Sequence, residues 1–332
     1  MKNVTIVVGT VGQSIMRSED SGQTWARIGP RRGFAYEASV RTIAMHPTDH
    51  KILFAGTERG LYRSEDAGAN WRYVDSALNP YYIWALAIDP TNPDVMFAGT
   101  GTPTPAMIFR SKDGGRSWEQ RPVEIAATCE AVGTPRVTGI AVDPVEPNNV
   151  WAGLEVDGAR HSSDGGETWS IVDATERRDI HNVAVTAGPP RAVFIVVNRE
   201  IYASTDNGRT WEPREMQKGL PWDYPRKENY LRAFAVDPGN PKRIFLGFGD
   251  FTPGSSGAIA ASEDFGKSWK LLPLPAEPNS SMWTFGTNAD DPKTIFAASR
   301  YGYLYRSDDG GGSWSKLRRE LSEIAAVCWV GN

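Results

Sequence analysis

Short apolar runs bounded by Pro, Gly, Asn or Asp recur along the whole chain. The segment RTIAMHPTDHKILFAGT, which starts at Arg41, predicts two strands joined by a proline-containing turn. Similar segments start at Ala85, Gly139, Ala233 and Thr284, and a degraded copy starts at Asn182. No run approaches the ~20 apolar residues that span a bilayer, so we expect no membrane span.

A second motif follows these strand pairs. The pattern S-x-D-x-G-x-[TSN]-W occurs seven times, starting at Ser18, Ser64, Ser111, Ser162, Ser204, Ser262 and Ser307. Its Asp can accept hydrogen bonds from N–H groups of its own turn, and its Gly permits a positive φ. Its Trp can bury a large ring against a neighbouring repeat. We therefore interpret the motif as a structural hairpin and assign its Asp no catalytic role.

Each repeat then contains four antiparallel strands, which is one blade of a β-propeller. The N-terminal segment supplies the strands VTIVVG, SIMRS and TWARIG, which lack an inner partner, and the C-terminal EIAAVCWVG supplies the missing inner strand. The sequence thus predicts an all-β fold, a seven-bladed propeller over residues 1–332 as a single domain. A C-terminal inner strand joined to N-terminal outer strands closes the ring.

The seven boxes resemble those of the Asp-box (BNR-repeat) propellers. That group includes sialidases, xyloglucan-cleaving glycosidases, sortilin-type receptors and photosystem assembly factors. The resemblance covers essentially the whole chain and implies the propeller fold. A single ring of seven boxes most resembles the assembly factors and small glycosyl hydrolase-like proteins, and the boxes themselves lie in the scaffold rather than in a site.

Charge and cysteine content narrow the class of partner and the compartment. Lys plus Arg total 36 against 40 for Asp plus Glu, a formal net charge of -4. Nucleic acid and anionic lipid need concentrated positive charge, so we expect neither as a partner. Neither Cys129 nor Cys328 requires a disulfide, and the N-terminus MKNVTIVVGTVGQS is typical of a strand rather than a secretory segment. We therefore expect a soluble, cytoplasmic protein.

Irregular loops gather on the face opposite the boxes, where a rigid scaffold would present a binding site. They include GPRRGFAYEAS, RPVEIAATCEAVGTPR, PREMQKGLPWDYPRKENY and GDFTPGSSGA. On this face we expect the inner strands to begin with Arg41, Trp84, Thr138, His181, Arg232, Trp283 and Ile324.

Four residues are candidates for catalysis at this mouth. His181 is a candidate general base or metal ligand. Glu58, Glu155 and Asp250 are candidates for an acid/base pair in glycoside cleavage, or for oxygen ligands of one divalent cation. Salt bridges to nearby arginines are the alternative interpretation of these carboxylates.

The remaining candidates would hold a substrate. Arginine can clamp a carboxylate through its forked guanidinium, and aromatic rings can stack on a sugar or close the pore. The candidate binding residues are Arg41, Trp84, Glu130, Arg136, Arg199, Arg232, Trp283, Arg300 and Tyr301, with Tyr36, Trp222 and Tyr224 as further aromatics.

The leading functional prediction is a small-molecule hydrolase or lyase that acts on an anionic or sugar-like substrate at the pore mouth. The alternative is a binding or assembly propeller without chemistry, whose partner is a protein segment on the same face. A narrow pocket would favour the enzyme, and an exposed arginine-rich surface would favour the binding module.

Overall fold

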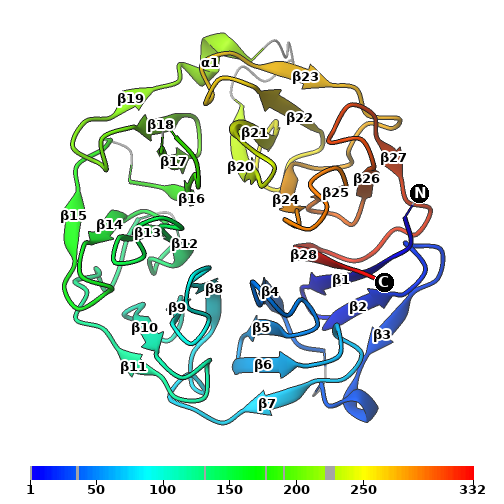
Figure 1. The fold of residues 1–332 in the computed structure, drawn as a ribbon, viewed down its shortest axis with the longest axis horizontal. Coiled ribbons are helices and arrows are strands. Elements are labelled where there is room, and N and C mark those ends of the chain that lie inside the picture. Colours follow the sequence, from blue (N-terminus) through cyan, green and yellow to red (C-terminus); the bar gives the residue numbers. More distant parts are fainter. Residues whose placement is uncertain (1, 35–36, 131, 176–177, 190, 221–228) are drawn as a thin grey trace.

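The computed structural model describes residues 2–34, 37–130, 132–175, 178–189, 191–220 and 229–332, and it contains seven four-stranded antiparallel sheets arranged as a ring (Figure 1). This confirms the predicted all-β, seven-bladed propeller. We number the blades along the chain and give their strands from the central channel outward.

The first of the seven blades closes the ring, and the next two follow it along the chain. Blade 1 consists of β28 (Ile324–Gly331), β1 (Val4–Thr10), β2 (Ile15–Ser18) and β3 (Ala26–Ile28). Blade 2 consists of β4 (Val40–Met45), β5 (Leu53–Thr57), β6 (Gly60–Ser64) and β7 (Arg72–Val74). Blade 3 consists of β8 (Ile83–Ile88), β9 (Met96–Thr100), β10 (Ile108–Ser111) and β11 (Glu119–Gln120).

Four further blades continue around the ring. Blade 4 consists of β12 (Val137–Val142), β13 (Val150–Leu154), β14 (Gly158–Ser162) and β15 (Ser170–Val172). Blade 5 consists of β16 (Ile180–Val185), β17 (Val193–Val197), β18 (Ile201–Ser204) and β19 (Glu212–Pro213). Blade 6 consists of β20 (Tyr230–Asp237), β21 (Asn240–Gly249), β22 (Gly257–Ser262) and β23 (Lys270–Leu272). Blade 7 consists of β24 (Met282–Gly286), β25 (Ile295–Ser299), β26 (Leu304–Ser307) and β27 (Ser315–Lys316).

Two loops of the face opposite the boxes contain short helices. A 3-10 helix spans Pro30–Arg32, and α1 spans Met216–Gly219. Ring closure follows the predicted arrangement, because β28 pairs antiparallel with β1 from Val4↔Gly331 to Thr10↔Ile324. The first and last strands therefore lie side by side in one sheet (Figure 1).

The Asp boxes join the third and fourth strands of each blade and form the predicted hydrogen bonds. In the box of blade 4, the Ser162 hydroxyl donates to Asp164 at 2.7 Å and accepts from the Gly166 N–H at 2.8 Å. Asp164 accepts from the N–H and hydroxyl of Thr168 at 2.9 and 2.6 Å. The Trp169 indole N–H donates to the Gly166 carbonyl at 3.2 Å, and the ring packs edge-on against Phe97 of blade 3. These contacts confirm the structural interpretation of the motif.

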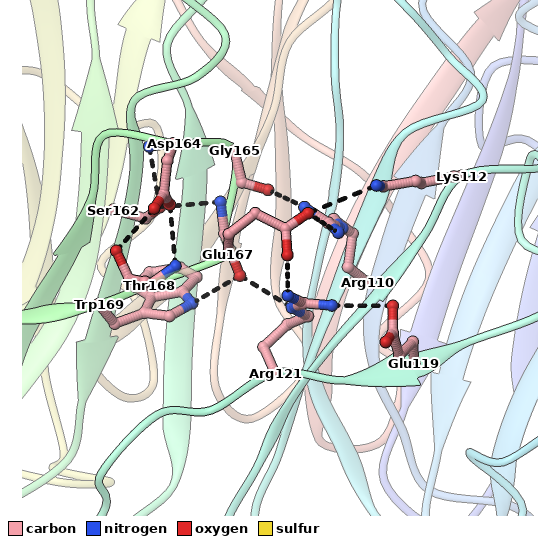
Figure 2. Close-up of polar contacts among 11 residues, drawn as sticks. Arg110, Lys112, Glu119, Arg121, Ser162, Asp164, Gly165, Glu167, Thr168 and Trp169 are labelled. Carbon is pink, nitrogen blue, oxygen red and sulfur yellow. Dashed lines mark hydrogen bonds and ion pairs between the residues drawn. The ribbon is translucent and has the colours of Figure 1, made fainter.

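Two buried arginines of blade 3 tie the box of blade 4 to that blade, as Figure 2 shows. Arg110 donates to the Gly165 carbonyl and to Glu167, both at 2.5 Å. Arg121 donates to the Gly166 carbonyl at 2.8 Å and also pairs with Glu167. Both arginines are more than nine-tenths buried, so their charges need these partners. The packing between blades makes the ring a rigid support for its two faces.

Candidate functional site: the channel mouth

A β-bulge near the start of every inner strand points one side chain toward the channel. The pairing registers skip one residue per blade, and the skipped residues are Arg41, Trp84, Thr138, His181, Arg232, Trp283 and Ala325. Bulges re-aim side chains in this way. All seven residues line one central cavity of about 260 Å³.

The bulge in β28 corrects one expectation. We predicted that Ile324 would face the channel, but Ile324 pairs with Thr10 and is fully buried between blades 1 and 7. The bulge shifts the channel position one residue along the chain, so Ala325 lines the cavity instead.

A second ring lies two residues before the bulged positions and consists of Ser39, Tyr82, Arg136, Asp179, Tyr230, Ser281 and Glu323. Five of these residues contact the inner ring. Tyr82 and Glu323 contact Arg41, Arg136 contacts Trp84, and Asp179 and Tyr230 contact His181. Tyr82, Asp179, Tyr230 and Glu323 were missed as candidates, although the spacing of two from each inner-strand start would have identified them.

The mouth contains two clusters in which one tryptophan contacts two arginines. The guanidinium groups of Arg232 and Arg300 lie 4.3 and 4.0 Å from the ring centroid of Trp283. Those of Arg41 and Arg136 each lie 4.7 Å from the centroid of Trp84. The tryptophan faces attract the cations and hold them in place. Both tryptophans therefore act as supports for arginines.

Two carboxylates pair with three of these four arginines. Glu323 pairs with Arg300 and lies 3.7 Å from Arg41, so it joins the two clusters. Glu155 pairs with Arg136 at 3.0 Å. Within the part of the chain that the structure describes, no carboxylate lies within ion-pair distance of the half-buried Arg232.

Burial and two neighbouring arginines disfavour the charged form of Arg300. The pKa of Arg300 is lowered to about 10, chiefly because the group is buried. The charges of Arg41 and Arg232 act in the same direction, and the charge of Glu323 opposes them. An added anion would relieve the repulsion among these arginines.

His181 is almost completely buried beneath the mouth, with 1% of its side chain exposed. Its Nδ1 lies 2.5 Å from the Leu231 carbonyl, and because a carbonyl only accepts, Nδ1 carries the hydrogen. Its Nε2 lies 3.4 Å from both the Asp179 carboxylate and the Tyr230 hydroxyl. Burial tends to raise the pKa of Asp179, but the His181 hydrogen bond and the charges of Arg232 and Arg136 lower it below its ordinary value.

Two of the candidate catalytic carboxylates accept hydrogen bonds from backbone N–H groups and do not line the cavity. Glu58, in the turn after β5, accepts from the Ser39 N–H at 2.8 Å. Asp250 is 3% exposed and accepts from the N–H groups of Ser255 and Ser256 at 2.9 and 3.1 Å. Burial opposes ionisation, but these hydrogen bonds lower the pKa of Asp250.

The other candidates lie away from the cavity lining. Glu130 is exposed on the loop before β12. Arg199 lies in the turn after β17, where its carbonyl accepts from Gln217 at 2.8 Å. The side chain of Tyr301 is 46% exposed beside Arg300. Tyr36, Trp222 and Tyr224 fall outside the described residues.

Two further properties concern metals and membranes. Among the residues described, no three His, Cys, Asp or Glu side chains gather closely enough to hold a metal ion. The same residues include no helix with the length and apolar content to cross a membrane.

Comparisons with known proteins place these features in context. The Sortilin-Vps10 family matches residues 13–139, and the BNR/Asp-box repeat family matches residues 202–213. A xyloglucanase of Hypocrea jecorina (strain QM6a) is 24% identical over 331 aligned positions, which cover 84% of this chain and 38% of that protein. The photosystem II assembly protein Ycf48 of Thermosynechococcus vestitus is 23% identical over 275 positions, 78% of this chain and 66% of that protein. The chain spans between a quarter and two fifths of the length of the xyloglucanases it matches.

Solved structures show the same architecture. The GH74 xyloglucanase from Xanthomonas campestris superposes with a TM-score of 0.64 at 23% identity, covering 83% of this chain and 45% of that one. A Ycf48 structure bound to D1 peptide superposes with a TM-score of 0.57 at 17% identity, covering 85% and 81%. The seven boxes, the seven blades and the repeat match together identify the chain as a seven-bladed β-propeller of the Asp-box (BNR-repeat) kind.

Proposed function

We propose that this chain is a ligand-binding propeller whose channel mouth takes an anionic group of its ligand. The observation that carries the proposal is Arg232, which stacks on Trp283 and has no carboxylate partner among the described residues. A guanidinium fork binds carboxylate and phosphate oxygens in pairs, and a partly buried charge gains most from such a partner. The neighbouring charge of Arg300 adds to the attraction.

The size of the cavity favours one group of a larger ligand. Its volume of about 260 Å³ lies just below the ~300–1,000 Å³ of pockets that enclose a whole small molecule. A carboxylate side chain or chain terminus fits this space, with the remainder of the ligand on the surrounding face. The Ycf48 relative that binds D1 peptide supports a protein segment as the larger ligand.

The mouth carboxylates support binding more than acid–base catalysis. Glycoside cleavage needs one carboxylic acid with a raised pKa next to an ionised carboxylate. Glu155 and Glu323 pair with arginines, and the pKa of Asp179 is lowered. Among the described carboxyl groups, a raised pKa is found at Glu200, where burial raises it and the N–H groups of Ile201 and Met216 hold it in the turn before β18.

A hydrolase or lyase that acts on a sugar-like or anionic substrate is the second candidate. The sequence similarity to xyloglucanases favours it, and Glu155, Asp179 and His181 would be its catalytic residues at the mouth. Release of reducing ends from xyloglucan oligosaccharides, lost in Glu155→Gln, would establish this second function in place of simple binding.

A thermal-shift panel tests the binding proposal. Sulfate, phosphate, citrate, sugar acids and divalent cations with and without chelator would each be added to the purified protein, since a ligand of the native state raises the midpoint. We expect a rise with multivalent anions that Arg232→Ala abolishes. The matched control Arg209→Ala removes an exposed arginine from the box of blade 5 and should keep the rise. The absence of an anion effect, or an effect that survives in Arg232→Ala, would refute the proposal.

A further inference from the structure

Two large aromatic side chains stand exposed beside the arginine-rich mouth. Phe251 is 58% exposed in the loop after β21, and Tyr301 is 46% exposed in the turn after β25. Scattered exposed hydrophobics are ordinary, but aromatic and arginine side chains gathered in one area are enriched at interfaces.

Both aromatics are fixed to the start of the same inner strand. The Ser281 hydroxyl donates to the Phe251 carbonyl, and the Tyr301 N–H donates to the Ser280 hydroxyl at 2.9 Å. The Arg300 N–H donates to the Ser281 carbonyl at 2.9 Å. Consecutive serines therefore bring Phe251, Tyr301 and Arg300 to one part of the mouth.

The loop that presents Phe251 is held from inside. The buried Asp250 accepts from Ser255 and Ser256 and closes the loop. Tyr230, whose hydroxyl lies 3.4 Å from His181 Nε2, lies near Thr252 of the same loop. An aromatic side chain held on a fixed backbone loses little conformational entropy when it binds a partner.

We infer that Phe251, Tyr301 and the Arg232–Trp283–Arg300 cluster form one docking surface for a protein segment that carries an acidic residue beside an aromatic or aliphatic one. The inference rests on the proposed function, because the acid would occupy the anion position at Arg232. The apolar neighbour would cover Phe251 and Tyr301 outside the channel, where a small inorganic anion makes no contact. Charge complementarity selects an acidic segment over a basic one.

Two labelled nine-residue peptides test the inference by fluorescence anisotropy. GSEFDELSG carries acids beside Phe and Leu, and GSEADEASG keeps the acids but replaces both apolar residues with Ala. We expect the first peptide to bind at least tenfold more tightly. The double variant Phe251→Ala, Tyr301→Ala should reduce its affinity to that of the second peptide, because aromatic anchors dominate such interfaces. Arg232→Ala should weaken both peptides.

Controls separate docking from folding and from the proposed function. The variant side chains are exposed, and the backbone contacts to Ser280 and Ser281 remain, so the unfolding midpoint should stay unchanged. Ile171→Ala removes a 65% exposed apolar side chain from the outer strand of blade 4 and should leave peptide binding intact. Equal affinity for the two peptides, or tight binding that survives in the double variant, would overturn this inference alone. Failure of both peptides to bind, with the anion effect on the midpoint intact, would also overturn it while leaving the proposed function standing.

Discussion

Replacement of Glu323 by Gln should strengthen anion binding and weaken the fold at the same time. Glu323 is the internal carboxylate that joins Arg41 to Arg300 and so competes with any ligand acid at the mouth. The amide keeps the shape of the side chain and removes its charge. The two consequences have opposite signs, which makes the variant diagnostic.

The gain in affinity follows from Coulomb repulsion. An anion bound by Arg232 and Arg300 would lie roughly 6 Å from Glu323, where two negative charges repel by about 3 kcal/mol at an effective dielectric of ~20. Salt screening and partial solvent exposure reduce this to about 1–2 kcal/mol, so the dissociation constant for sulfate or an acidic peptide should fall about tenfold.

The loss of stability follows from the same ion pairs. Breaking a fully buried pair costs about 3–5 kcal/mol, and Glu323 is 28% exposed, so we expect about 1–3 kcal/mol. For a chain of this size the midpoint should fall by roughly 1–4 °C. The cost arises because Arg41 and Arg300 then face each other without the shared carboxylate.

Isothermal titration with sulfate and thermal unfolding without ligand measure the two effects. Glu58→Gln is the control, because Glu58 lies on the same face but holds the Ser39 N–H instead of an arginine. It should leave anion affinity unchanged. Unchanged or weaker anion binding by Glu323→Gln would refute the assignment of the ligand acid to this cluster.

Three further predictions concern the scaffold. Hydrogen bonds from the Ser313 hydroxyl and N–H lower the pKa of Asp309 to about 2 from its ordinary 3.8. The ionised Asp309 therefore stabilises the fold fully above about pH 4, and this contribution is lost as the pH falls toward 2. A urea midpoint that stays flat over that range would contradict the prediction. Ser162→Ala leaves the buried Gly166 N–H unpaired and should lower the free energy of unfolding in urea by about 1–3 kcal/mol. An unchanged free energy would contradict the structural role of the box. Gly208→Ala and Gly12→Ala both place a Cβ at a positive φ, but only the first brings it to 2.3 Å from the Trp151 ring. The midpoint of thermal unfolding should therefore fall clearly more for Gly208→Ala, and equal falls would argue against this packing.

Much of the site could be located from the sequence, because inner-strand starts follow from the repeat. Arg41, Trp84, Thr138, His181, Arg232 and Trp283 all line the cavity as the alignment of repeats predicted. Ile324 did not, because a bulge in β28 shifts the register by one residue, and a local pairing irregularity leaves no signal in hydrophobic alternation.

Roles within the site were harder to predict than positions. Trp84 and Trp283 were candidates for sugar stacking, but the structure places two arginines against each ring. His181 was a candidate base, but its contacts are with Asp179, Tyr230 and the Leu231 carbonyl below the surface. A residue type at a given position does not reveal which neighbour will neutralise it.

The sequence by itself determined the box hairpins, the four strands of each blade and the closure of the ring. The hairpins depend on local contacts, such as the Asp113 carboxylate with Ser117 four residues later, and the strands on a repeated alternation of apolar residues. Closure followed from a count, because three N-terminal strands lacked an inner strand and the C-terminal segment supplied one. Only the tertiary structure decided which charges meet at the mouth. Arg41, Arg300 and Glu323 come from three blades and lie together because closure places β28 between β4 and β24. Arg232 lies within ion-pair distance of no carboxylate among the described residues, and the proposed binding function depends on that.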